Sequence, residues 1–180
     1  ISIMFIAQEK KKSNIIEYVL YLWQVENIIR ACQFDVNIIE KNVINQMGLD
    51  ANEKSLVIDW YNDLVKQMKS QALQQDGHLA FTKEIIVELA MLHQTLLKTF
   101  QDKLYNPAYN NARGDIYDLQ KKQLAPVSEV EACLNGLFGL WMLKIGKKEV
   151  SAATQQSFDR ISKLLARLGK NYHEMMGAVS

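Results

Sequence analysis

Three polar side chains share one narrow stripe of an otherwise apolar segment near the N-terminus. In EYVLYLWQVENIIR, residues 17–30, a helical rotation of about 100° per residue puts Glu17, Tyr21 and Gln24 on that stripe. A carboxylate, a phenol and a carboxamide on a central helix must either be solvated or find hydrogen-bond partners. The stripe could therefore bind a small polar molecule, or it could be a structural network.

A single histidine occupies the middle of an apolar face in the segment after residue 80. His93 shares this face with Leu89, Leu92, Leu96 and Phe100, so a buried imidazole is expected. In a low-dielectric pocket the ring could be a general base or a pH-sensitive switch partnered by Glu17, Glu131 or Tyr21. The alternative is a core histidine bonded to a backbone carbonyl or to a neighbouring acid.

Glu131 and Asn135 are one helical turn apart and could line the same cavity. With them, the candidate ligand-binding residues are Glu17, Tyr21, Gln24, His93, Glu131 and Asn135. Glu26 and Arg30 lie on the opposite side of the first helix, four residues apart with the acid first. This order suits an exposed or half-exposed ion pair that contributes only to stability.

The last helical segment has a basic edge opposite an apolar seam that runs from Phe158 to Met175. Phosphate or an acidic protein could bind this edge, although a solvated face predicts the same pattern. No aromatic residues alternate with its basic ones, so binding of nucleic acid is not expected. The residues of the basic edge are Arg160, Lys163, Arg167 and Lys170.

The elements that position these side chains are predicted to be helices only. Proline occurs only at positions 107 and 126, and apolar residues recur every three or four positions almost throughout. The pattern predicts an all-α fold: a single antiparallel bundle of about seven helices in one domain of residues 1–180. Residues 1–13 are expected to be a weakly structured N-terminal extension. Helix starts are predicted at Asn14, Asp35, Asp50, Thr82 and Ser128, with Pro107 in the first turn of another helix.

One predicted helix, residues 129–145, has a stripe of small residues. Ala132, Gly136 and Gly139 lie on this stripe, and each interior glycine costs about 1 kcal/mol relative to alanine. Close approach of another backbone would compensate for that cost. The approaching segment could belong to the same chain or to a second copy in a homodimer.

Composition excludes several classes of protein. The net charge of +1 gives no global field that would attract nucleic acid or an acidic membrane. The longest apolar run, residues 136–146, is too short to span a bilayer, and no secretory signal is visible. Cys32 and Cys133 are in neither a CxxC pair nor a zinc-type spacing, so a reducing, cytoplasmic location is expected.

Sequence motifs give no sign of a cofactor. GxGxxG, the P-loop, GxSxG and HExxH are absent, and Glu88 and His93 are five residues apart, which does not fit the Glu-x-x-His of di-iron bundles. Neither a cofactor nor a metal is expected.

Three blocks of the chain resemble one protein family. They are EYVLYLWQVENIIR, GHLAFTKEIIVELAMLHQTLL (77–97) and EVEACLNGLFGLWMLKIGKKEVSAAT (129–154). Together they look like the bacterial domain of unknown function 4924 family, with similarity in order over nearly the whole chain. The resemblance implies a bacterial source and a single domain. That family has no assigned activity, so no functional residue is transferred from it.

Two hypotheses of function follow. The first is a non-enzymatic, cytoplasmic module that associates with itself or with another protein through an apolar or small-residue helix face. The second is a helical pocket around Glu17, Tyr21 and His93 that binds a small molecule or acts on it.

Overall fold

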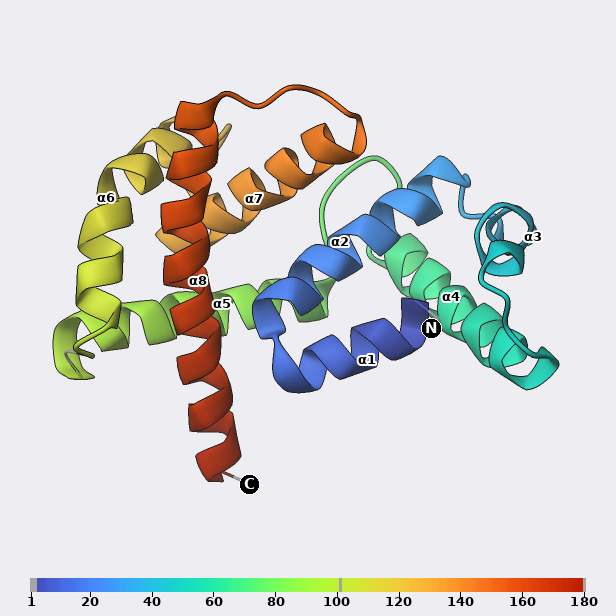
Figure 1. Cartoon of the computed structure of the whole chain (residues 1–180). Coiled ribbons are helices and arrows are strands. Elements are labelled where there is room, and N and C mark those ends of the chain that lie inside the picture. Colours follow the sequence, from blue (N-terminus) through green and yellow to red (C-terminus); the bar gives the residue numbers. More distant parts are fainter. Residues whose placement is uncertain (1–2, 101, 180) are drawn as a thin grey trace. The chain divides into compact units, whose positions relative to one another are not determined.

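The computed structural model describes residues 3–100 and 102–179, and it confirms the all-α class (Figure 1). The described residues form eight α-helices where about seven were predicted, together with a 3-10 turn, η1 (Ile44–Gln46), and a π-helical turn, η2 (Leu96–Phe100). The α-helices are α1 (Ile3–Ser13), α2 (Ile15–Ala31), α3 (Val36–Asn42), α4 (Ala51–Ser70), α5 (Ala80–Thr95), α6 (Tyr105–Lys121), α7 (Glu129–Ile145) and α8 (Ala152–Val179).

The packing divides the chain into two compact units, Ile1–Glu84 and Ile85–Ser180, and each is described by itself. The first unit contains α1 to α4 and the start of α5. The second contains the rest of α5, then η2 and α6 to α8. The single domain predicted from the sequence stays a prediction.

Several predicted helix starts are confirmed by side-chain caps. Oδ1 of Asn14 accepts from the backbone N–H of Glu17 at 3.1 Å, and Oγ of Ser128 accepts from that of Glu131 at 3.1 Å. Asp50 and Glu53 form a complete capping box at the start of α4. These bonds satisfy backbone donors that the first helical turn leaves without a partner.

Residues 3–13 form helix α1, so the weak structure expected for the N-terminal extension is wrong for this stretch. Met4 and Ala7 are buried, and α1 contacts α2 and α4. Burial of this short apolar side stabilises a helix that would be marginal by itself in water.

The core of the first unit lies among α2, α3 and α4. On α4, Leu56 is exposed and the buried row begins at Val57. That row keeps the three- and four-residue spacing of a helix stripe. Its members are Val57, Tyr61, Leu64, Val65 and Met68.

The second unit packs α6, α7 and α8 against one another, as Figure 1 shows. The seam predicted on α8 is buried at Ile161, Leu164, Leu165, Leu168 and Tyr172, whereas Met175 is exposed. A Cβ added at Gly136 of α7 would lie 2.9 Å from both methyl carbons of Leu119 on α6. The close approach at this glycine is therefore made within the unit, and by a side chain.

Helix α5 starts and ends differently from the prediction. It begins at Ala80, and the hydroxyl of Thr82 donates to the carbonyl of Leu79 at 2.7 Å, so Thr82 is not the cap. Side chains from elsewhere cap the helix: Gln71 Oε1 accepts from the N–H of Ala80 at 2.8 Å. At the other end η2 turns the chain, and Phe100 is exposed instead of lying on the apolar face.

Candidate functional site

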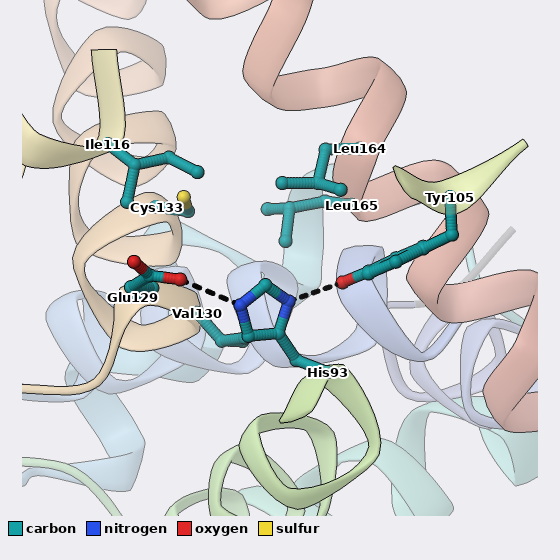
Figure 2. A pocket seen from close by; sticks show the side chains of 8 residues that line it. All are labelled: His93, Tyr105, Ile116, Glu129, Val130, Cys133, Leu164 and Leu165. Carbon is teal, nitrogen blue, oxygen red and sulfur yellow. Dashed lines mark hydrogen bonds and ion pairs between the residues drawn. The ribbon is translucent and has the colours of Figure 1, made fainter. Parts of the chain in front are cut away.

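His93 of α5 lies between an acid and a phenol (Figure 2). Its Nδ1 is 2.6 Å from Oη of Tyr105 on α6, and its Nε2 is 2.8 Å from Oε2 of Glu129 in the first turn of α7. The predicted burial of the imidazole is confirmed. The predicted partners are wrong, because both ring nitrogens are occupied by residues other than Glu17, Glu131 and Tyr21.

The charge on Glu129 determines how protons are placed in this cluster. The hydrogen bond from His93 is the main cause that lowers the pKa of Glu129, and the hydroxyl of Tyr109, which donates to Oε1 at 3.0 Å, adds to the effect. An ionised carboxylate only accepts, so Nε2 of the imidazole carries a proton. In the neutral ring Nδ1 then accepts from Tyr105, whose phenol stays protonated because burial raises its pKa.

The space beside His93 is small. Apolar side chains line it, and it is too small to hold a water molecule. Burial also raises the pKa of the Cys133 thiol in this lining to about 12, so the thiol stays protonated near neutral pH. With every polar group of the cluster bonded to another, the cluster joins α5, α6 and α7 and leaves no room for a ligand. The apolar lining consists of Ile116, Val130, Cys133, Leu164 and Leu165.

The predicted stripe on α2 is not a hydrogen-bonded cluster. Glu17 is exposed and forms an ion pair with Lys10 of α1. Tyr21 is half-buried, and desolvation raises its pKa to about 12. The buried Oε1 of Gln24 has no hydrogen-bond partner in the described part of the chain.

Glu131 and Asn135 make hydrogen bonds to different partners. The backbone N–H of Glu131 is held by the Ser128 cap, and Nδ2 of Asn135 donates to Oε1 of Gln123 at 2.9 Å. Among the described residues, none of the six predicted ligand-binding side chains is hydrogen-bonded to another of the six.

The basic edge of α8 is largely neutralised within the second unit. Arg160 binds both carboxylate oxygens of Asp115, at 2.7 and 2.9 Å. Arg167 is 2.8 Å from Oδ2 of Asp102, and Lys170 is 3.9 Å from Glu174. Of the four predicted residues, exposed Lys163 alone has no ion pair with a described residue.

A second histidine and acid pair lies in the first unit. Glu26 of α2 is only 1% exposed, so the predicted exposed or half-exposed pair with Arg30 is wrong. Its Oε2 is 2.7 Å from Nδ1 of His78, and its Oε1 accepts from the backbone N–H of Leu79 at 3.0 Å. Arg30 instead donates to the backbone carbonyls of Leu73 and Gly77. Glu26 and Arg30 of α2 thus both hold the α4–α5 loop.

Comparison with protein families gives one match. Residues 4–178 match the family described as "Domain of unknown function (DUF4924)". The chain belongs to the DUF4924 family. Comparison with curated proteins and with solved structures finds no match.

The sequence reasoning about this DUF4924 chain missed His78, Tyr105 and Glu129. His78 lies in a loop, where helical periodicity says nothing of its neighbours. The only signal for it was that Glu26, a carboxylate within a largely apolar helix, needed a partner. Tyr105 and Glu129 each stand near a predicted helix start, which gave no indication that they face His93.

Within residues 3–100 and 102–179 of the DUF4924 chain, no group of three or more His, Cys, Asp or Glu side chains is placed to hold a metal ion. None of the helices described is both long and apolar enough to cross a bilayer.

Proposed function

We propose that the main role of this DUF4924 protein is a non-enzymatic one: it is an interaction module that associates through an apolar helix face, most simply with a second copy of itself. The observation that carries the proposal is a pair of large apolar side chains on α5. Val87 is 58% exposed and Met91 is 66% exposed. They are one helical turn apart, so they lie on the same face. An exposed apolar face of a helix is a common site of protein association.

The state of the His93 cluster supports this proposal over a small-molecule pocket. A binding pocket normally offers free polar groups around a cavity of about 300 Å³ or more. Both nitrogens of His93 are occupied, and the adjacent space is too small for a water molecule. The alternative function, a pocket around Glu17, Tyr21 and His93, therefore has less support than association.

A bacterial source and a cytoplasmic location are part of the proposal. Cys32 and Cys133 are both buried free thiols. Free thiols of this kind are typical of proteins that work in a reducing compartment.

Light scattering coupled to size exclusion tests the association. The wild-type protein is expected to be dimeric at micromolar concentration, and Met91→Glu is expected to make it monomeric because a carboxylate at a buried interface costs several kcal/mol. Leu124→Glu is the matched control, since Leu124 is fully exposed but lies between α6 and α7. A wild-type monomer at high concentration contradicts self-association. If Met91→Glu and Leu124→Glu change the oligomeric state equally, the proposed interface on α5 is wrong.

A further inference from the structure

The Glu26–His78 pair has one side buried and one side open. Glu26 is buried, whereas the side chain of His78 is 31% exposed. The ring of Trp23 stacks on the imidazole, with centroids 4.1 Å apart and planes 15° apart. The ring is thus fixed by a hydrogen bond at Nδ1 and by an aromatic face, so its orientation does not depend on a ligand.

The contacts of Glu26 select one tautomer of His78. Oε1 already accepts from the N–H of Leu79, and Oε2 lies against Nδ1. A carboxylate in these contacts accepts, so Nδ1 carries the proton and Nε2 of the neutral ring keeps its lone pair. Nε2 has no hydrogen-bond partner among the described residues, and the atom is not fully buried. It therefore points its lone pair to solvent.

We propose that His78, positioned by Glu26, is an acyl-accepting site for small molecules with an activated carbonyl group, such as esters. A neutral imidazole with a free lone pair on one nitrogen and a carboxylate behind the other is suited to nucleophilic and acid–base work. Glu26 is the positioning residue, because it touches only the far side of the ring. The proposal does not depend on self-association.

The step balances without a cofactor. The lone pair of Nε2 attacks the carbonyl carbon, an N–C bond forms, and the C–O bond of the ester breaks so that the alcohol leaves as its anion. The positive charge on the ring is stabilised by the Glu26 carboxylate, as in other carboxylate–imidazole pairs. Water then attacks the acyl carbon and the N–C bond breaks, which releases the carboxylic acid and restores the neutral imidazole; the remaining proton of the water passes to the alcohol anion.

Two measurements on the full chain test the proposal. Nitrogen-15 NMR of wild-type protein above pH 8 is expected to show a protonated Nδ1 and a bare Nε2 for His78. With p-nitrophenyl acetate as the probe, wild-type protein is expected to release p-nitrophenolate at least about tenfold faster than His78→Asn, which keeps every other nucleophile. Glu26→Gln retains a hydrogen-bond acceptor but not the charge, so its rate is expected to fall between the two.

The outcomes separate a chemical role from a structural one. Equal rates for wild type and His78→Asn overturn the proposal, as does a wild-type ring with its proton on Nε2. If Glu26→Gln folds and releases p-nitrophenolate as fast as wild type, Glu26 is a structural loop anchor only and the proposal fails. If Glu26→Gln does not fold, the proposal is still tested by the tautomer of His78 in wild type and by the rate of p-nitrophenolate release by His78→Asn.

Discussion

The phenol oxygen of Tyr105 lies 2.6 Å from Nδ1 of His93, and the rings of the two residues meet edge to face with their centroids 5.8 Å apart. Tyr61 of α4 is as deeply buried as Tyr105, but its hydroxyl has no partner in the described part of the chain. Two equally buried phenols thus differ in their hydrogen bonding.

Replacement of each phenol by phenylalanine is expected to have different effects on stability. Tyr105→Phe leaves Nδ1 of His93 buried without a partner and should lower the free energy of unfolding by about 1–3 kcal/mol. Tyr61→Phe removes only an unpaired buried hydroxyl and should be neutral or stabilising. Urea unfolding followed by circular dichroism measures both. A loss of stability in Tyr61→Phe equal to that in Tyr105→Phe would show that the hydrogen bond to His93 is not the cause.

The ion pair between Asp102 and Arg167 is expected to make stability depend on pH in the acid range. The hydrogen bond from Arg167 is the main cause that lowers the pKa of Asp102 from 3.8 to about 2. Since the folded pKa is the lower one, the stabilisation is complete above pH 3.8 and is lost as the pH falls towards 2. The difference in unfolding free energy between wild type and Asp102→Asn should therefore shrink across this window.

Asp118→Asn is the control for this titration. Asp118 is exposed and has no ion pair with a described residue. The unfolding free energy of Asp118→Asn should follow that of wild type at every pH between 2 and 6. A constant difference between Asp102→Asn and wild type over the same range would contradict the assigned cause.

The two interior glycines of α7 form a matched pair. A Cβ at Gly139 meets nothing within 4 Å, so Gly139→Ala should stabilise the protein by up to about 1 kcal/mol through helix propensity. At Gly136 a Cβ would lie 2.9 Å from Leu119 and 3.1 Å from Phe158, and overpacking of this kind costs about 1–3 kcal/mol. In thermal unfolding, Gly136→Ala should have a lower midpoint temperature than Gly139→Ala. The reverse order would mean that Leu119 moves aside without cost.

Arg30 is expected to protect the α4–α5 loop. Its Nε donates to the carbonyl of Leu73 at 3.0 Å, and its second guanidinium donor binds the carbonyl of Gly77. Hydrogen bonds to charged groups contribute about 1.5–3 kcal/mol, so Arg30→Ala should destabilise the unit by an amount in that range. Hydrogen exchange measured by mass spectrometry should accelerate in residues 71–79. Lys41→Ala, a change at an exposed position, should leave the exchange of this loop as it is in wild type.

Local signals of the sequence predicted the helices and much of the burial. The caps at Asn14, Asp50 and Ser128 use contacts within three residues, and periodicity alone placed His93 in an apolar face. The prediction for residues 3–13 failed because α1 depends on packing against α2 and α4. Tertiary contacts of this kind leave no mark in a short window.

The partners of the two bonded histidines could not be read from the sequence. Helix α2 is apolar on nearly all sides, so a helical wheel did not decide that Glu26 is buried and Glu17 exposed. His93 and Glu129 are 36 residues apart, and pairing them requires the packing of α5 against α7. A loop residue such as His78 has no periodic pattern at all. These contacts depend on three-dimensional packing and not on spacing.

The bonded chain from Tyr105 through His93 to Glu129 also determines how three helices align along their axes. Leucine and isoleucine side chains can exchange one apolar neighbour for another when a helix slides by one turn, about 5.4 Å. An imidazole with two directed bonds cannot, because each shifted arrangement leaves a buried nitrogen or oxygen unpaired. The cluster thereby excludes slipped arrangements of α5, α6 and α7 that apolar contacts would tolerate.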